Sequence, residues 1–458
     1  MRFSSKPIAQ TDEAPLADEG RFEAILERFD RRDAPARARS TEGNACYVVS
    51  ALDDDADDDE RARLNEILGL VRAHGDRVLG QRTVRLRKRD PKTYLGKGLS
   101  RELAEHAFDA GADMIVVDAE LSPSQMRNLE DATGLPIADR EAVILEVFQA
   151  HATTRRARIQ VELAHLEYLR PRIRGLGLEM DQQAGGAMKA RGPGETASEL
   201  LARRLDGRLV DLRRALAKLS RAGATQRRRR TDCGRVALVG YTNAGKTSLM
   251  NALTGAGLSA RDQPFETLDA TARCLTRRGG DVVVSDTVGF IRNLPERLMA
   301  SFESTLAEVA DATLLAIVVD VADVEWRMHL AETERVLARL GAADIPRLLV
   351  FNKIDRLASP VDDQSLARAA GGHDHVALSS HDARAVAALR ERLVAGARPL
   401  REVRRVFVPY EDAARMDHVH RRCVVLASDA KPHGIRFTVE ADAHVLDELA
   451  QPTTRERP

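Results

Sequence analysis

Residues 234–254 read GRVALVGYTNAGKTSLMNALT, and this stretch decides the fold of the chain. Gly234–Val239 is an apolar run typical of a buried strand, and Ser248–Thr254 is helical in character. Between them, Gly240 to Thr247 match the pattern GxxxxGK[ST]. In this strand–loop–helix arrangement, backbone N–H groups surround phosphate oxygens. The stretch therefore predicts an α/β domain with a phosphate-binding loop.

The residues of this loop are the types that phosphate chemistry requires. Lys246 is expected to bridge the β and γ phosphates, and the Thr247 hydroxyl to coordinate Mg²⁺. The N-terminus of the following helix adds positive potential at the same place. The predicted phosphate contacts are Gly240, Tyr241, Thr242, Asn243, Ala244, Gly245, Lys246 and Thr247.

A second strand, Val282–Ser285, ends in Asp286-Thr-Val-Gly289. A carboxylate at the carboxyl end of a strand can hold the metal through water, and a glycine N–H can contact the γ-phosphate. Lys246 and Gly289 are therefore candidate catalytic residues. The predicted contacts of this segment are Asp286, Thr287, Val288 and Gly289.

A third strand, Leu348–Phe351, ends in Asn352-Lys-Ile-Asp355, and this pattern favours guanine. The Asp355 carboxylate can accept hydrogen bonds from guanine N1–H and the 2-amino group together. Adenine has neither donor and would leave a charged acceptor unpaired, at a cost on the order of several kcal/mol. A fourth strand, Val376–Leu378, precedes a turn whose backbone N–H could contact guanine O6. The predicted base contacts are Asn352, Lys353, Ile354, Asp355, Ser379, Ser380 and His381.

The segment Phe265-Glu-Thr-Leu-Asp269 lies between the phosphate loop and the second strand. A threonine here can complete the Mg²⁺ shell only when the γ-phosphate is present, which predicts an order–disorder switch. Thr267 and Thr271 both have the chemistry for this role. The predicted contacts of this segment are Phe265, Glu266, Thr267, Leu268 and Asp269.

Hydrolysis by the isolated chain is expected to be slow. Many GTPases place Gln directly after DxxG to orient the attacking water, but here the residue is Phe290, which cannot accept a hydrogen bond. Backbone groups, another side chain or a partner must then position the water. Asn243 could hold a K⁺ ion between the α and γ phosphates, or it could only make local bonds. Arg292 could act as an arginine finger in cis. Its motif is more easily interpreted as part of the switch segment that follows DxxG.

The composition excludes several classes of function. The 70 Lys and Arg residues balance the 70 Asp and Glu residues, so the net charge indicates no polyanionic partner. Aromatic residues make up only 4% of the chain, which argues against a surface that binds nucleic acid mainly by base stacking. The four cysteines contain no CxxC pair, which rules out a zinc ribbon or redox dithiol as the central feature. The N-terminal sequence has no apolar signal region, and the longest apolar run, Leu314–Val319, is far shorter than the roughly 20 residues that cross a bilayer. We expect a cytoplasmic protein without membrane insertion.

Strands and helices alternate upstream of the phosphate loop, which predicts a parallel α/β sheet. The acidic run Asp53–Glu60 could bind a cation, but a solvated loop is the favoured interpretation. Residues 1–40 lack periodicity and are expected to be a disordered extension. The predicted elements are Cys46–Leu52, Arg61–Ala73, Val78–Leu86, Leu99–Ala110, Met114–Asp118 and Pro123–Thr133.

A helical period begins near Ala157 and predicts a hairpin of two amphipathic helices. We expect Gly175–Thr196, with its six glycines, to be the joining loop, which is long enough to be functional or disordered. The second helix is rich in Arg and ends in Arg227–Arg230. These basic residues could simply make a solvent-exposed helix face followed by a linker. Their density instead favours a surface that binds the phosphate backbone of a nucleic acid.

These motifs together resemble the HflX family of translational GTPases over nearly all of the chain past residue 45. The segments that carry the resemblance are Pro91-Lys-Thr-Tyr-Leu-Gly-Lys97, Glu120-Leu-Ser-Pro-Ser-Gln-Met-Arg-Asn-Leu-Glu130, Arg191-Gly-Pro-Gly-Glu-Thr196, GYTNAGKT, FETLD and DTVGFIRNLP. The sequence departs from the family pattern in a longer hairpin loop, in FETLDAT where FATLDPT is commoner, and in Ser380-His381 after Ser379.

The resemblance implies the domain organisation and the partners. Thr247 and Thr267 would be the Mg²⁺ ligands, with Thr267 also catalytic, and the substrate would be GTP. The protein would be a monomer whose partner is the 50S ribosomal subunit with its rRNA, and not DNA. When bound to GTP, it could split stalled ribosomes. The hairpin loop would reach toward rRNA near the peptidyl transferase centre. The implied regions are 1–45 (extension), 46–150 (N-terminal α/β subdomain), 151–230 (basic helical hairpin), 231–400 (P-loop GTPase domain) and 401–458 (small α/β domain).

Two other functions remain open at this stage. The chain could be a GTP-gated adaptor that docks on RNA or a ribosome with incidental turnover. Alternatively, it could be an ATP-driven RNA remodeller, since some family members also bind ATP, although Asn352 and Asp355 argue against ATP as the primary nucleotide.

Overall fold

The computed structural model describes most of the chain. The described residues are 43–53, 60–183, 197–228, 233–255, 265, 271–275, 282–292, 294–295, 298, 308–359, 362–397 and 401–450. The chain divides into two compact units, Met1–Val147 with His165–Asp211, and Phe148–Ala164 with Leu212–Pro458. This division falls inside the helices of the predicted hairpin, so the predicted boundaries at residues 150 and 230 stay predictions. Among the described helices, none combines the length and apolar composition that crossing a membrane requires.

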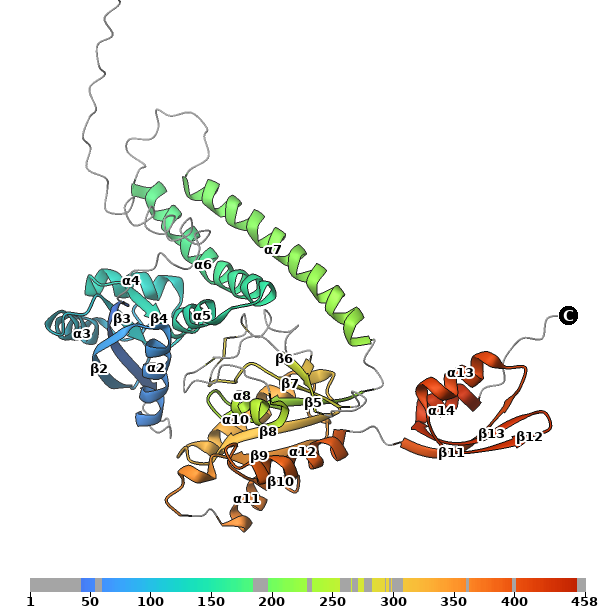
Figure 1. Ribbon diagram of the computed structural model, residues 1–458. Helices are drawn as coiled ribbons and strands as arrows, with labels where there is room; N and C mark the ends of the chain where they lie inside the picture. Colours follow the sequence, from blue (N-terminus) through green and yellow to red (C-terminus); the bar gives the residue numbers. More distant parts are fainter. Residues whose placement is uncertain are drawn as a thin grey trace, which may run out of the picture. The chain divides into compact units, whose positions relative to one another are not determined.

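The first sheet has four parallel strands in the order β2-β1-β3-β4 (Figure 1). This arrangement confirms the predicted parallel α/β sheet, but β4 and α5 were not predicted. Its strands are β1 (Ala45–Asp53), β2 (Arg77–Leu86), β3 (Met114–Val117) and β4 (Ile137–Asp139). The helices that alternate with or follow them are α2 (Glu60–His74), α3 (Lys97–Asp109), α4 (Pro123–Thr133) and α5 (Arg140–His151).

Local signals fix both ends of α4. Ser122 Oγ accepts a hydrogen bond from Gln125 N at 3.2 Å, and Gln125 Oε1 accepts one from Ser122 N at 3.0 Å, which together form a capping box. Pro123 occupies the first turn, where its missing N–H is not needed. Gly134 ends the helix at φ 69°, a conformation that favours glycine. These signals explain why the predicted and observed bounds of α4 agree.

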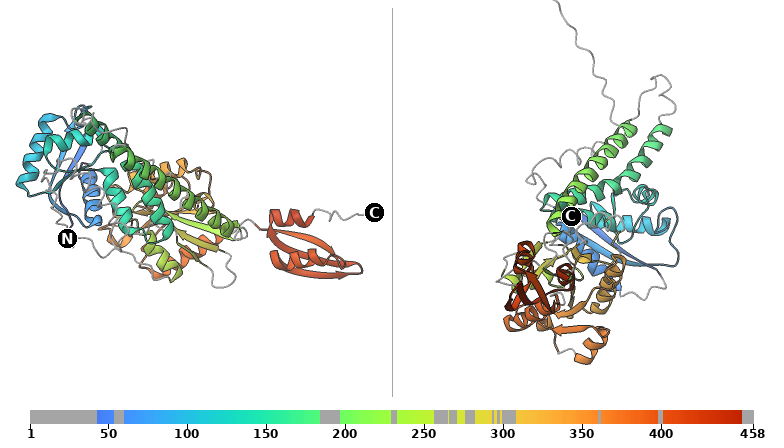
Figure 2. Two further views of the ribbon diagram at one scale, coloured as in Figure 1. Left: turned by 90° about the horizontal axis from the view of Figure 1, so that it is seen from above. Right: turned by 90° about the vertical axis from the view of Figure 1, so that its right-hand side faces the viewer.

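The two hairpin helices are α6 (Arg155–Gln183) and α7 (Ala197–Arg228), which lie side by side in Figures 1 and 2. Part of the predicted joining loop was therefore wrong, because α6 continues through Gly175 and Gly177. Each glycine costs about 1 kcal/mol in a helix, but the leucine, glutamate and methionine residues among and after them are good helix formers. The rest of that prediction, residues 184–196, lies outside the described residues, as do Arg229 and Arg230.

Buried polar groups attach α6 to the end of β4. Tyr168 donates its hydroxyl to Asp139 Oδ1 at 2.9 Å, and Arg172 Nη2 donates to Asp139 Oδ2 at 2.9 Å. The Arg172 guanidinium also lies 3.4 Å from the centre of the Tyr168 ring, a cation–π contact. Burial raises the pKa of Asp139, and the charge of Arg172 opposes that shift. Asp139 therefore accepts from two residues of α6, and Arg172 also donates to Leu121 O at 3.1 Å.

The second sheet has six strands in the order β10-β9-β8-β5-β7-β6, and only β6 is antiparallel to its neighbour. Because the other strands are parallel, their carboxyl ends meet at one edge, where ligands bind in open α/β sheets. The strands are β5 (Gly234–Val239), β6 (Thr271–Cys274), β7 (Val282–Asp286), β8 (Leu314–Asp320), β9 (Arg347–Asn352) and β10 (Asp374–Ala377). The described helices are α8 (Lys246–Thr254), α10 (Trp326–Arg339), η4 (Ile354–Arg356), α11 (Asp363–Ala369) and α12 (Ala383–Ala397).

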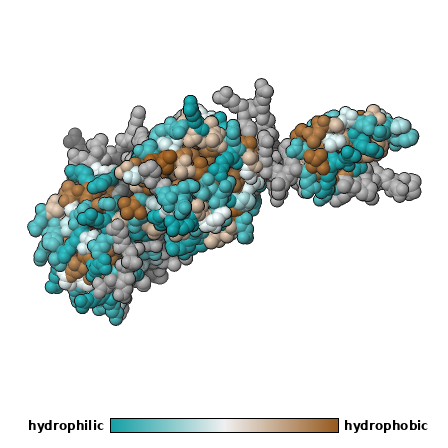
Figure 3. All heavy atoms as spheres, turned by 90° about the horizontal axis from the view of Figure 1, so that it is seen from below, coloured by the Kyte–Doolittle hydropathy of each residue, from teal (hydrophilic) through white to brown (hydrophobic). Residues whose placement is uncertain are grey.

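The last sheet has three antiparallel strands in the order β11-β13-β12, and helices α13 and α14 lie on one side of it (Figures 1 and 2). Its core includes Val408, Val419 and Phe437. Some apolar side chains of this domain are exposed, among them Phe407 and Leu426. Figure 3 shows hydrophobic surface beside hydrophilic surface on the same domain. Its elements are β11 (Arg401–Pro409), α13 (Ala413–Arg422), β12 (Val424–Lys431), β13 (Gly434–Asp442) and α14 (Ala443–Ala450).

Candidate functional site

The phosphate loop runs from the end of β5 to the start of α8, and two positions in it accept only glycine. Gly240 has φ 149°, and a Cβ there would lie 2.2 Å from Val318 O. Gly245 has φ 89°, and a Cβ there would lie 2.4 Å from Asn352 Nδ2. A side chain at either position would clash with a neighbouring strand or its end, so the glycines let the loop fold tightly against the sheet.

Lys246 is the first residue of α8, and its side chain is almost fully buried. Its Nζ donates to Gly240 O at 3.1 Å and to Tyr241 O at 2.8 Å, both within the phosphate loop. Burial lowers the pKa of Lys246 to about 8, while the charge of Asp286 acts in the opposite direction. The ammonium group therefore lies inside the loop, where phosphate charge would stabilise its protonated form.

Thr247 and Asp286 bring two oxygen ligands together. The Thr247 hydroxyl donates to Asp286 Oδ2 at 2.8 Å, which joins α8 to the carboxyl end of β7. Asp286 is fully buried. Hydroxyl and carboxylate oxygens beside a phosphate site are the ligands that Mg²⁺ prefers. The residues present therefore fit a magnesium ion.

Gly289 lies directly against the phosphate loop. A Cβ on Gly289 would lie 2.9 Å from Thr242 Cα and 3.1 Å from Lys246 Nζ. Thr287, two residues earlier, donates its hydroxyl to Leu238 O at 2.7 Å and so fixes the segment on β5. The structure thus brings the predicted residues Lys246 and Gly289 together.

Phe290 is buried and attached to the phosphate loop through its backbone. Its N–H donates to Gly240 O at 3.1 Å, and its carbonyl accepts from Thr242 N at 2.7 Å. These two bonds pair Phe290 with Tyr241 in an isolated parallel β-bridge. The side chain is 1% exposed. A buried hydrocarbon ring has no group with which to orient water, in agreement with the sequence argument.

Arg292 lies in the same segment and does not extend as a finger in this structure. Its Nη2 forms an ion pair with Glu325 Oε2 at 2.9 Å, and the residue is buried. The alternative role of Arg292 as an arginine finger is therefore not supported. Sequence reasoning missed Glu325, because a single acidic residue in a loop belongs to no motif.

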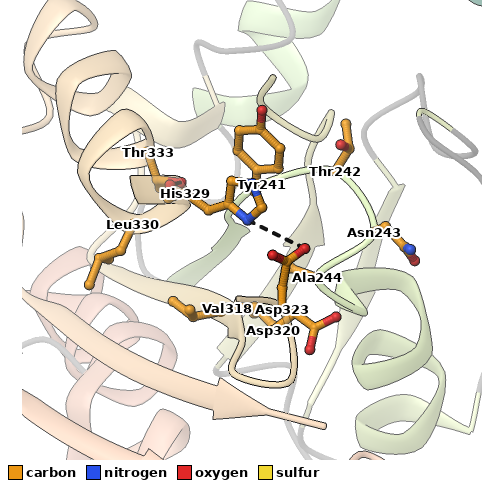
Figure 4. Close-up of a pocket in the computed structure, with 11 residues that line it drawn as sticks. Tyr241, Thr242, Asn243, Ala244, Val318, Asp320, Asp323, His329, Leu330 and Thr333 are labelled. Atoms are coloured by element: carbon orange, nitrogen blue, oxygen red, sulfur yellow. Dashed lines mark hydrogen bonds and ion pairs between the residues drawn. The ribbon is translucent and has the colours of Figure 1, made fainter. Parts of the chain in front are cut away.

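Tyr241 and His329 form a second contact that the sequence did not indicate. Their rings are stacked, with centroids 3.8 Å apart and planes at 14° (Figure 4). They help to line a cavity of about 30 Å³, together with Asp323 and Leu330. Figure 4 shows the Asn243 side chain turned away from this cavity.

Asn352 and Lys353 brace the phosphate loop from β9. Asn352 Nδ2 donates to Ala244 O at 3.0 Å, and its Oδ1 accepts from Ser380 N at 3.1 Å. Lys353 Nζ donates to Asn243 O at 2.7 Å and pairs with Asp320 Oδ2 at 2.8 Å. Asn352 therefore links the turn after β10 to the phosphate loop, and Lys353 links that loop to the end of β8.

Asp355 is exposed on η4, which follows Lys353. A hydrogen bond from the Ser379 hydroxyl holds the pKa of Asp355 below its usual value, so the carboxylate stays charged. Ser379 Oγ also accepts from His381 N at 3.2 Å, which orders the turn after β10. The carboxylate and the turn predicted to read guanine therefore lie together, and Ile354 is partly exposed beside them.

The switch segment is described only in part. Phe265 is buried with φ 60°, and its ring packs edge-on against Phe148 with centroids 4.5 Å apart. Thr271 begins β6 and pairs with Asp286 in the strand ladder. Residues 266–270, which include the predicted ligand Thr267, lie outside the described residues, so their assignment stays a prediction.

Comparison with known families covers three consecutive parts of the chain. Residues 61–149 match the family described as GTP-binding GTPase N-terminal, and residues 151–230 match GTP-binding GTPase Middle Region. Residues 235–353, which contain the phosphate loop and Asn352, match the family described as 50S ribosome-binding GTPase.

Curated relatives extend this similarity. The GTPase HflX of Spirochaeta thermophila is 46% identical over 274 residues, which cover 59% of this chain and 67% of that protein. The GTPase HflX of Caldanaerobacter subterraneus is 36% identical over 405 residues, covering 88% of this chain and 92% of that protein. A solved GTP-binding protein from Sulfolobus solfataricus in complex with GDP is 21% identical, with a TM-score of 0.42 over 77% of this chain and 98% of that one.

Proposed function

Because the chain belongs to the HflX family of GTPases, we propose that it uses GTP binding and hydrolysis to associate with the 50S ribosomal subunit and to split or rescue stalled ribosomes. The observation that carries the GTPase assignment is the convergence of four strand ends on one edge of the second sheet. Asp286 and Asn352 end β7 and β9, Lys246 begins the helix after the loop that follows β5, and Ser379 follows β10 and bonds Asp355.

Each part of GTP is recognised by a different group. The backbone N–H groups of the phosphate loop and the ammonium of Lys246 bind the β and γ phosphates, and the Asp355 carboxylate accepts from the guanine base. Thr247 and Thr267, with Asp286 acting through water, would hold a Mg²⁺ ion, which would neutralise phosphate charge. The substrate is GTP, and the products are GDP and phosphate.

Positioning of the attacking water limits the rate of the isolated chain. Phe290 is buried and lacks a polar group, so the Gly289 N–H and other backbone groups contact the γ-phosphate and the water. The ribosome completes this arrangement. Asn243, turned away from the small cavity, is the residue that would hold a K⁺ ion against the phosphates (Figure 4).

The basic face of α7 supports binding to ribosomal RNA. Leu205, Leu209 and Leu212 are buried on one side of the helix. Exposed basic residues occupy other positions, and their charge suits the phosphate backbone of RNA. These residues are Arg203, Arg204, Arg208, Arg213, Arg214, Lys218 and Arg221. We infer a cytoplasmic monomer that binds rRNA and not DNA.

Co-sedimentation with purified 50S subunits tests this function. The chain with a non-hydrolysable GTP analogue should sediment with 50S subunits, and the chain with GDP should not. The 50S subunits should also raise the GTP turnover number. Binding that is nucleotide-dependent with unchanged turnover would instead indicate a GTP-gated adaptor. Competition between GTP and ATP would detect an ATP-driven remodeller, and equal binding to duplex DNA would contradict RNA specificity.

A further inference from the structure

The side chain of Tyr241 reaches from the phosphate loop to the segment that follows Gly289. Its hydroxyl accepts a hydrogen bond from Arg292 N at 2.8 Å. Its ring is 6% exposed and stacks on the imidazole of His329 in α10 (Figure 4). The phenol is therefore held in one orientation by α10, with its oxygen directed at a backbone N–H.

Three hydrogen bonds join residues 290–292 to the phosphate loop. Two of them, Phe290 N to Gly240 O and Thr242 N to Phe290 O, are between backbone atoms and do not depend on side chains. The third requires the Tyr241 hydroxyl. A buried N–H that loses its acceptor must find another partner, so the backbone around Arg292 would move if the hydroxyl were removed.

We propose that Tyr241 is a positioning residue for GTP hydrolysis, which holds the backbone of residues 289–292 in the geometry that hydrolysis requires. The proposal rests on the proposed function, because it concerns the rate of GTP hydrolysis. Phe290 offers no polar group, so the position of the backbone replaces the side chain that orients water in many GTPases. A displacement of about 1 Å at a reacting group can cost two orders of magnitude in rate.

The same segment has a second attachment, which provides an independent signal. Arg292 Nη2 pairs with Glu325 Oε2 at 2.9 Å. The next residue, Trp326, is the chain's one tryptophan, is 5% exposed and packs edge-on against Phe351 with centroids 5.7 Å apart. A shift of the segment therefore reaches Trp326, whose fluorescence reports it.

The test uses the full chain with Tyr241→Phe, which keeps the stacked ring and removes only the hydroxyl. The turnover number for GTP should fall about tenfold, which corresponds to the loss of about 1.4 kcal/mol from the transition state. The KM for GTP and the affinity for GDP should stay within twofold, because the phenol contacts neither phosphate-loop N–H groups nor Asp355. Tyr168→Phe is the matched control, since it also removes a buried tyrosine hydroxyl bond but lies in the other unit.

Several outcomes would overturn the proposal. The first is a turnover number that is unchanged in Tyr241→Phe, and the second is a Tyr168→Phe variant that loses as much turnover as Tyr241→Phe. The third is a GDP affinity of Tyr241→Phe that falls by as large a factor as its turnover number. If the wild-type chain hydrolysed no GTP, the proposed function would fail, and Trp326 fluorescence would still decide whether Tyr241 holds the backbone of residues 289–292. A non-hydrolysable GTP analogue should change the emission more than GDP does, and Tyr241→Phe should at least halve that difference. Equal differences in the variant and the wild type would contradict it.

Discussion

Thr247 donates its hydroxyl to Asp286 Oδ2 at 2.8 Å, so the first turn of α8 is joined to the carboxyl end of β7. The two residues are far apart in sequence and belong to different motifs. A parallel sheet brings them together because β5 and β7 are neighbours and end at the same edge. The bond places a hydroxyl and a carboxylate where one hard cation can use both oxygens.

Thr247→Ala is expected to lower GTP turnover by roughly 100-fold at millimolar Mg²⁺, since it removes a ligand that Mg²⁺ needs at the phosphates. Thr247→Ser keeps the hydroxyl and should retain most of the activity. The measurement is the GTP turnover number as a function of Mg²⁺ concentration. If Thr247→Ala showed the same Mg²⁺ dependence as the wild type, this oxygen would not be a ligand.

Asp355→Asn is expected to weaken GTP binding by roughly 30- to 100-fold, because a charged acceptor for two guanine donors is lost. Xanthine carries a carbonyl where guanine carries its 2-amino group, so the new amide can donate to it. The variant should therefore bind xanthosine triphosphate more tightly than GTP. Competition against a fluorescent GDP derivative measures both affinities. The wild-type chain must show the reverse order, and equal preference in both proteins would rule out base recognition by Asp355.

Phe290→Gln is expected not to accelerate hydrolysis, although it restores the residue type that many GTPases use. The Phe290 side chain is 1% exposed, so an amide at this position would enter the core rather than the phosphate site. Burial of an unpaired amide should lower the free energy of unfolding by about 1–3 kcal/mol. Turnover assays and urea unfolding of the same preparation check both parts. A faster variant of unchanged stability would show that the side chain at 290 can reach the water.

Sequence patterns predicted the elements and contacts that depend on local signals. The phosphate loop follows from glycine positions and periodicity, and α4 from its cap residues and Gly134. These features depend on neighbours within a few residues. Strands β1, β2 and β3 of the first sheet were likewise predicted, from segments rich in apolar residues such as Met114–Val117.

Features that depend on distant contacts were not predictable in this way. Strand β4 has only three residues, Ile137–Asp139, and is too short to show a period. The glycines at 175 and 177 suggested a loop, whereas α6 continues through them. The roles of Glu325 and His329 arise only because the fold places them beside Arg292 and Tyr241.

Asp139→Ala is expected to lower the free energy of unfolding by about 3 kcal/mol. The change leaves the buried Tyr168 hydroxyl without its acceptor and removes the carboxylate partner of Arg172, which keeps only the carbonyls of Tyr168 and Leu121. Breaking such a pair is more costly than never forming it. Asp139→Asn should cost less, since the amide oxygen can still accept from Tyr168. Urea denaturation measures the difference, and GTP turnover without ribosomes should stay unchanged. Equal losses for Ala and Asn would show that the negative charge, and not the hydrogen bond from Tyr168, carries the stabilisation.

Nucleotide affinity is expected to fall as the pH rises above about 8. Burial holds the pKa of Lys246 at about 8 in the free protein, and bound phosphates favour its charged form. GDP binding therefore takes up a proton above that pH, and affinity should fall roughly five- to tenfold between pH 7.5 and 9. The sign is opposite for the stability of the free protein. Between about pH 8 and the unfolded pKa, the unfolded chain binds more protons, so this group's contribution to stability rises with pH.

Lys246→Arg separates this effect from ionisation of the guanine base at alkaline pH. Arginine stays charged throughout the range, so this variant should bind GDP more weakly at pH 7.5 but lose little further affinity up to pH 9. Calorimetry in two buffers of different ionisation enthalpy counts the protons taken up on binding. The wild-type chain should take up close to one proton per GDP at pH 9, and the variant close to none. Identical pH profiles for the two proteins would mean that Lys246 is already fully charged before the phosphates arrive.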